Sequence, residues 1–90
     1  MQDIYDWIDA NADECIRDLQ RLVRQPSISA QNVGLRECAA LVREMLHDDG
    51  LPAELHELEE GPPVVFGHLQ TGKPAKTILC YSHYDVQPPE

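Results

Sequence analysis

Basic residues are scarce in this chain. Seven Lys and Arg stand against 16 Asp and Glu, which gives a formal net charge of −9 at pH 7. Such a balance repels nucleic acid and anionic lipid, and it provides no basic footprint for either. The acidic residues are scattered along the sequence, so we interpret them as a solvated surface. The composition therefore predicts no nucleic-acid partner and no membrane partner.

Paired cysteines and long apolar runs are also missing. Cys15, Cys38 and Cys80 lie far apart, and no CxxC spacing indicates a structural zinc site or a redox dithiol. Each lies among apolar residues, so we expect three reduced, buried thiols of a cytosolic protein. The apolar runs are too short to cross a bilayer, and residues 1–3 do not open a signal peptide. We therefore expect a cytoplasmic location.

Two helices are predicted in the first half of the chain. Apolar residues recur at three- and four-residue steps between positions 4 and 23. Pro26 should end this helix, because its ring pushes Gln25 out of the helical region. A second amphipathic stripe predicts a helix over 33–48, with Gly50 placed for the left-handed conformation that ends many helices.

Three short strands are predicted after the helices. They cover 53–59, 63–69 and 77–81, with a turn at 61–63. The third segment is rich in β-formers without alternation, as expected of a strand covered on both faces. The order indicates an α/β fold in which the two helical stripes cover the third strand and bury Leu79.

His83 and Asp85 follow directly after the third predicted strand. If the extended path continues, alternation places the two side chains on the same side. The imidazole can bind a metal ion while the carboxylate holds the other ring N–H. A catalytic zinc usually needs three protein ligands and a water, however. By spacing alone, an ordinary polar histidine is the alternative to a metal ligand.

Other candidate residues have simpler interpretations. His56 and His68 would face each other across a loop at 61–63 and could bind zinc or nickel weakly, but we favour two exposed strand residues. Glu59-Glu60 is interpreted as a solvated turn and not as a catalytic glutamate pair. His47 is interpreted as a polar residue near the end of the second helix.

The sequence around His83 resembles that of a known protein family. Residues 78–88, ILCYSHYDVQP, resemble the first metal-site motif of the M20 family of dinuclear zinc peptidases, and HYDVQP is most similar to its carnosinase-like dipeptidase branch. Residues 22–29 are similar to the end of the family's first helix and the connector after it. Residues 33–51 are similar to its second helix, and 61–67 to the hairpin before the metal strand. The resemblance therefore covers nearly the whole chain in the family's order.

The resemblance implies a fold, a reaction and two site residues. Residues 1–90 would be the N-terminal portion of a catalytic domain, the start of a three-layer α/β/α sandwich with a mixed sheet. The reaction would be cleavage of dipeptides or short amides by water activated by two zinc ions, with manganese as the alternative metal. His83 would bind one metal, and Asp85 would be the catalytic-site acid that orients His83.

The family's remaining parts lie downstream of the matched region. They are the other metal ligands, an adjacent glutamate pair that includes the general base, and a lid domain through which family members form homodimers. The 90-residue chain alone is therefore expected to be catalytically incomplete. Two alternatives stay open: a non-enzymatic acidic α/β module that binds a partner protein, and a deacylase of N-acyl amino acids within the same family.

Overall fold

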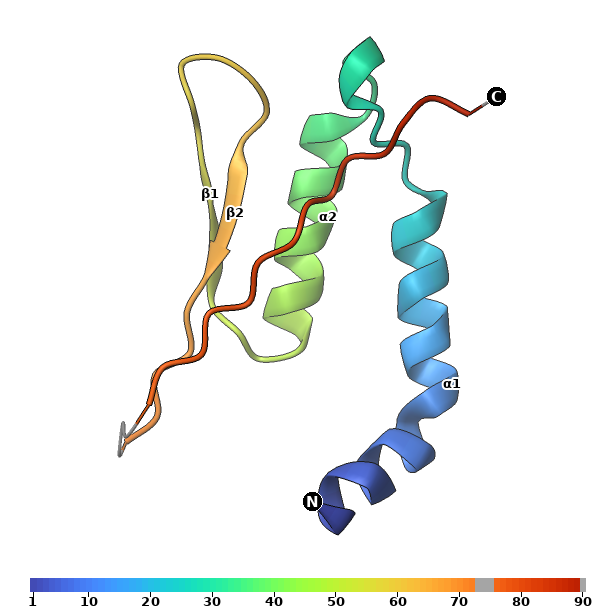
Figure 1. The fold of residues 1–90 in the computed structure, drawn as a ribbon, viewed down its shortest axis with the longest axis vertical. Coiled ribbons are helices and arrows are strands. Elements are labelled where there is room, and N and C mark those ends of the chain that lie inside the picture. The colour runs from blue at the N-terminus through green and yellow to red at the C-terminus, as the bar shows by residue number, and fades with distance from the viewer. Residues whose placement is uncertain (73–75, 90) are drawn as a thin grey trace.

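The structure, a computed structural model, describes residues 1–72 and 76–89. Its elements in chain order are α1 (Gln2–Arg24), the short 3₁₀ helix η1 (Ser29–Gln31), α2 (Leu35–Asp48), β1 (Ala53–His56) and β2 (Val64–Gly67). Figure 1 shows α2 between α1 and the β1–β2 hairpin, in agreement with the contacts that α2 makes with both. The predicted α/β class is confirmed.

The helices end where the sequence predicts. Gln25, the residue before Pro26, has an extended backbone (φ −79°, ψ 119°) and stops α1. Gly50 follows α2 with φ +85°. A third position, Gly34, precedes α2 with φ +74°, and a Cβ there would lie 2.1 Å from the carbonyl oxygen of Pro26. Glycine is therefore required where the connector between the helices turns into α2.

The two strands pair as an antiparallel hairpin. Ala53 lies opposite Gly67 and His56 lies opposite Val64, so seven residues, 57–63, form the connecting loop. The predicted hairpin is confirmed, with shorter strands than expected.

The core lies between α2 and the hairpin. Leu35, Cys38 and Ala39 of α2 are 5%, 1% and 0% exposed, and Pro63 before β2 is fully buried. In contrast, α1 contributes no buried residue. Burial of apolar area is thus concentrated on one face of α2.

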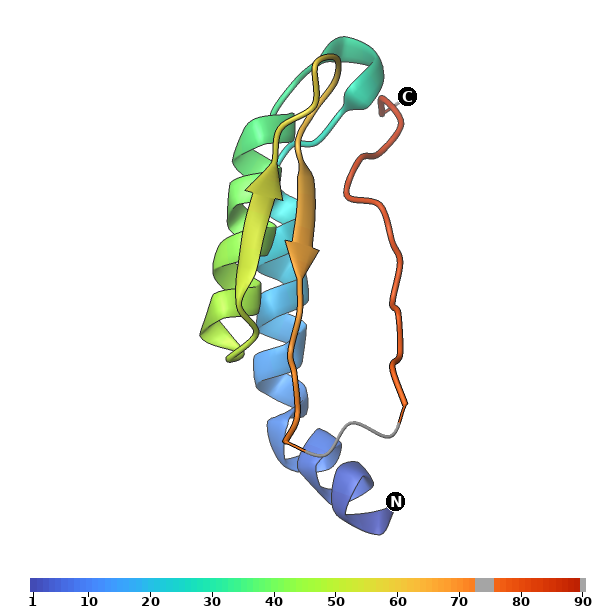
Figure 2. The ribbon, with the colours of Figure 1, turned by 90° about the vertical axis from the view of Figure 1, so that its left-hand side faces the viewer.

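The expected third strand is wrong. The backbone of 76–81 forms no regular element, and Leu79 is 85% exposed. Figure 2 shows the C-terminal segment standing apart from the hairpin. A strand needs a hydrogen-bonded neighbour and packed faces, whatever its β-propensity, and 76–81 has neither within the part of the chain that the structure describes. The three-layer sandwich with a mixed sheet is expected of the longer protein and stays a prediction, because the described residues form one two-stranded antiparallel sheet.

Two of the expected buried thiols are exposed. Cys15 on α1 and Cys80 in the C-terminal segment are exposed, whereas Cys38 is buried, and all three are free. The apolar stripe of α1 is also uncovered, with Leu19 60% and Val23 74% exposed. The expectation failed because an apolar sequence neighbourhood predicts burial only when another element covers that face. Among the described residues, no helix has the length and apolar character to cross a membrane.

Candidate functional site

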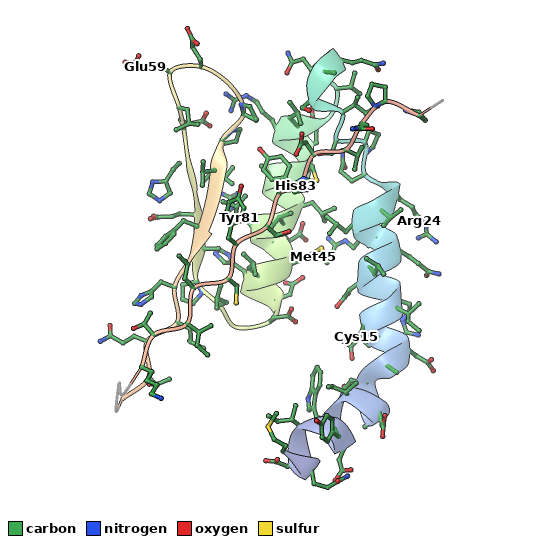
Figure 3. The ribbon with its side chains drawn as sticks, viewed as in Figure 1. Cys15, Arg24, Met45, Glu59, Tyr81 and His83 are labelled. Atoms are coloured by element: carbon green, nitrogen blue, oxygen red, sulfur yellow. The ribbon has the colours of Figure 1, made fainter. Side chains whose placement is uncertain are left out.

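His83 and Asp85 are in direct contact. The Nδ1 atom of His83 lies 2.9 Å from Oδ1 of Asp85 and 3.0 Å from the Asp85 backbone carbonyl oxygen. Both partners accept hydrogen bonds, so Nδ1 carries the proton and the neutral ring presents a lone pair on Nε2. Figure 3 shows His83 where the C-terminal segment passes over α2. The side chain of His83 is 75% exposed, and that of Asp85 is 41% exposed.

The second oxygen of the Asp85 carboxylate is also bonded. The Oγ atom of Ser29 donates to Oδ2 of Asp85 at 2.7 Å. The hydrogen bond from Ser29, followed by the one from His83, holds the pKa of the Asp85 carboxyl below its ordinary value. The carboxylate is therefore ionised at neutral pH and suited to accept the N–H of His83.

The connector between the helices holds the backbone around this pair. Ser27, which is 3% exposed, donates its hydroxyl to the carbonyl oxygen of Tyr84 at 2.5 Å. The N–H of Val86 donates to the carbonyl oxygen of Ser27 at 2.7 Å, and Ile28 and Val86 form a parallel bridge. The chain on both sides of Asp85 is thus fixed to residues that lie almost sixty positions earlier.

Tyr84 attaches the same segment to the hairpin. Its hydroxyl donates to the carbonyl oxygen of Pro63 at 2.7 Å. Burial raises the pKa of the Tyr84 phenol above its ordinary value. The Cys38 thiol lies 3.9 Å from the Tyr84 carbonyl oxygen. Tyr84 therefore points to the core, while His83 and Asp85, on either side of it, face away.

Sequence reasoning assigned no site role to Ser27, Ser29 or Tyr84. The hydroxyls of the Pro-Ser-Ile-Ser connector were a signal, because a polar, extended segment between helices often carries hydrogen bonds. The partner could not be inferred, since Ser29 and Asp85 are 56 positions apart.

The alternative in which His56 and His68 face each other is wrong. His56 lies opposite Val64, and its Nε2 is 2.8 Å from Oε1 of Glu54. Its ring also meets Phe66 edge-on, with centroids 5.9 Å apart. The hairpin loop is longer than three residues and is centred two positions earlier than the alternative required, so the two histidines are out of register. The preferred interpretation holds for their exposure, because both histidines are exposed. His56 ends β1, whereas His68 lies one residue past the end of β2 and is not in the strand.

Two further segments have the position and exposure that the sequence predicts. Glu59 and Glu60 are exposed in the hairpin loop. His47 is exposed near the end of α2, where its Nε2 lies 2.8 Å from the carbonyl oxygen of Ala53. In the described parts of the chain, no group of three or more His, Cys, Asp or Glu is placed to hold a metal ion. The donor chemistry of His83 therefore fits one ligand position and not a complete site.

Comparison with known proteins gives one informative relative. The chain is 32% identical over 98 aligned residues to Cys-Gly metallodipeptidase dug1 of Schizosaccharomyces pombe. The alignment covers 94% of this chain and 20% of that protein, so the chain spans about a fifth of the length of the curated relative it matches. No family model matches the chain, and no solved structure matches it. The similarity relates nearly the whole chain to a metallopeptidase.

Proposed function

We propose that this chain is the N-terminal portion of the catalytic domain of an M20-type metallopeptidase that cleaves dipeptides or short amides. The observation that carries the proposal is the His83–Asp85 contact, in which Nδ1 is 2.9 Å from the carboxylate and Nε2 is left with the lone pair. It lies in the segment with the most specific resemblance to that family. The 32% identity to a metallodipeptidase supports the same assignment.

Each of the two residues has a separate role in this proposal. His83 binds one of two metal ions through Nε2, with zinc as the expected metal and manganese as the alternative. Asp85 holds the Nδ1–H, fixes the tautomer and makes the ring a better ligand. When bound, the metals would lower the pKa of a water molecule and polarise the scissile carbonyl.

The rest of the machinery is proposed to lie in a longer protein. Three protein ligands are usual for a catalytic zinc, and among the described residues no group of three or more His, Cys, Asp or Glu is placed to hold a metal ion. We therefore infer that downstream segments supply the other ligands, the general base and a lid domain that forms a homodimer. The exposed residues Ile78 and Leu79 would become a covered strand when such segments pair with them.

The test is hydrolysis by the full-length protein that carries this chain. A panel of dipeptides that includes Cys-Gly, together with N-acyl amino acids, is incubated after chelation and after zinc or manganese is restored. We expect dipeptide cleavage that is lost on chelation and recovered with metal. Cleavage of only the N-acyl amino acids would favour the deacylase, and a metal-loaded protein that cleaves neither class would contradict the proposal.

A binding module is the second candidate, because the apolar stripe of α1 is exposed, including Ile16 at 53% and Leu19 at 60%. In such a protein, His83 would have no metal. Metal analysis of the purified full-length protein separates the two candidates: bound metal in wild type that falls in His83→Ala supports the peptidase, and its absence from both supports the module.

A further inference from the structure

We propose that Ser29 is a positioning residue for the His83–Asp85 pair. Its hydroxyl holds the Asp85 carboxylate in the orientation that keeps the proton of His83 on Nδ1 and the lone pair on Nε2. The consequence for metal binding rests on the proposed function. The effect of Ser29 on the tautomer of the His83 ring does not rest on the proposed function, because the tautomer can be observed in the metal-free chain.

The geometry gives each carboxylate oxygen one side-chain donor. Oδ2 of Asp85 accepts from Ser29 at 2.7 Å, and Oδ1 lies 2.9 Å from Nδ1 of His83. A free Asp carboxylate rotates in a broad, roughly two-fold well about its terminal torsion. With both oxygens engaged, rotation breaks two hydrogen bonds at once, so Ser29 limits the directions in which Asp85 can meet the imidazole.

The backbone next to Ser29 is held by hydrogen bonds. The preceding residue, Ile28, exchanges two backbone hydrogen bonds with Val33, with N–O distances of 2.8 Å and 3.1 Å. Ile28 also bridges Val86, whose N–H is bonded to the buried Ser27. The Ser29 hydroxyl therefore projects from a backbone that is hydrogen-bonded to the residues just before α2 and is bridged to the segment that carries His83 and Asp85. This distinguishes it from an incidental hydrogen bond between two mobile surface side chains.

The expected effect is a weakened preference and not a reversal. The Nδ1 atom of His83 also lies 3.0 Å from the Asp85 backbone carbonyl oxygen, which remains an acceptor when Ser29 is altered. Removing one side-chain hydrogen bond should therefore reduce the ratio of the Nδ1–H to the Nε2–H tautomer by about two- to tenfold.

The test is nitrogen NMR of the histidine rings in the 90-residue chain. Two-bond nitrogen–proton correlations, recorded at a pH about two units above the ordinary histidine pKa, report the tautomer of neutral His83. Wild type should be mainly Nδ1–H. Ser29→Ala should lower that fraction, and Ser29→Thr, which keeps the hydroxyl, should restore it. Ser82→Ala is the matched control, because Ser82 has no side-chain hydrogen bond among the described residues; it should leave the ratio unchanged.

Three results would overturn the proposal. They are a mainly Nε2–H ring in wild type, an unchanged ratio in Ser29→Ala, and an equal loss in Ser29→Ala and Ser29→Thr. Amide hydrogen exchange at Val86 is measured in parallel. Loss of protection there in Ser29→Ala would assign Ser29 to docking of the segment and would also overturn the positioning role.

The full-length protein separates this proposal from the function on which it builds. If Ser29→Ala changes the tautomer and weakens zinc binding, both proposals are supported. The loss of affinity should stay below the about 10- to 100-fold typical of removing a ligand's direct partner. If the tautomer changes but wild type binds no metal and cleaves no substrate, the positioning role stands and the peptidase assignment falls.

Discussion

At His83, the two ring nitrogens have different surroundings. Nδ1 is engaged by Asp85, and Nε2 is the atom that carries the lone pair. In His56 and His47 the engaged atom is Nε2, through Glu54 in the first and the Ala53 carbonyl in the second. A fixed imidazole with its outer nitrogen available suits a metal ligand. Of these three histidines, His83 has the geometry that the proposed chemistry needs.

The first prediction separates ligand from orienting acid in the full-length protein. His83→Ala should lower metal content and remove nearly all hydrolysis, because a ligand is lost. Asp85→Asn should keep the metal but lose about 10- to 100-fold in activity, because the amide holds the ring less well. The measurements are elemental analysis and kcat/KM. His56→Ala is the histidine control and should be normal, whereas full metal content with normal turnover in His83→Ala would refute the assignment.

The second prediction concerns pH and a pair away from the site. The guanidinium of Arg36 makes two hydrogen bonds to Glu57, at 2.8 Å and 2.9 Å, and thereby lowers the pKa of Glu57 from its ordinary value. Because the pKa of Glu57 is lower in the folded than in the unfolded chain, the pair stabilises the fold at pH values above the unfolded-state pKa. This contribution is lost as the pH falls through the folded-state pKa. Carbon NMR titration should find that the pKa of Glu57 rises in Arg36→Ala. In the control Arg43→Ala it should not move, and an unmoved pKa in Arg36→Ala would show that the contact is absent in solution.

At the scale of elements, the sequence predicts what local chemistry determines. Periodicity and Pro26 define α1, and Gly50 marks the end of α2. The sequence predicts the hairpin but not its register. The register depends on which loop residues pack into the core, and Pro63, the last loop residue, is buried. The predicted strand over 77–81 is wrong. Its composition favours a strand only where a neighbouring strand can pair with it, and the described part of the chain provides no such neighbour.

The third prediction tests the turn into α2. Gly34→Ala combines a positive φ with a Cβ 2.1 Å from the Pro26 carbonyl oxygen, and this neighbour is backbone that cannot move aside easily. The left-handed conformation alone costs about 1–2 kcal/mol, so the free energy of unfolding of Gly34→Ala should fall by more than that. Gly72→Ala is the control, since no described residue contacts a Cβ placed there. Denaturant unfolding of both variants checks the difference, and equal midpoints would contradict it.

The fourth prediction locates the core. Leu35 on α2 is 5% exposed, so Leu35→Ala should cost about 2–5 kcal/mol. Leu79 is 85% exposed, so Leu79→Ala should change the stability of this chain by less than about 0.5 kcal/mol. Chemical unfolding gives both values. A large cost at Leu79 would mean that this segment is covered in solution, as the sequence alone indicated.

At the scale of the whole molecule, the chain is more open than its length requires. Its radius of gyration is 15.4 Å, compared with about 12 Å expected for a compact domain of this size. The difference arises from α1, whose apolar stripe is largely exposed, and from the C-terminal segment, which stands apart from the hairpin (Figures 1 and 2). The site shares this openness. The sequence predicted His83 and Asp85 because their motif is local, but it could not predict Ser29, which the fold brings to Asp85 from 56 positions earlier in the chain.

The fifth prediction follows from that openness. The isolated chain should bind zinc no more tightly than about micromolar and should hydrolyse no dipeptide, because one imidazole leaves most of the zinc shell to water. Its uncovered segment 78–81 should also favour self-association by strand pairing. Calorimetric zinc titration, a peptidase assay and a sizing measurement at several concentrations test these points together. Tight, stoichiometric binding with metal-dependent turnover would mean that these residues complete a site, within one chain or between two, and would contradict the inference that downstream segments supply the missing ligands.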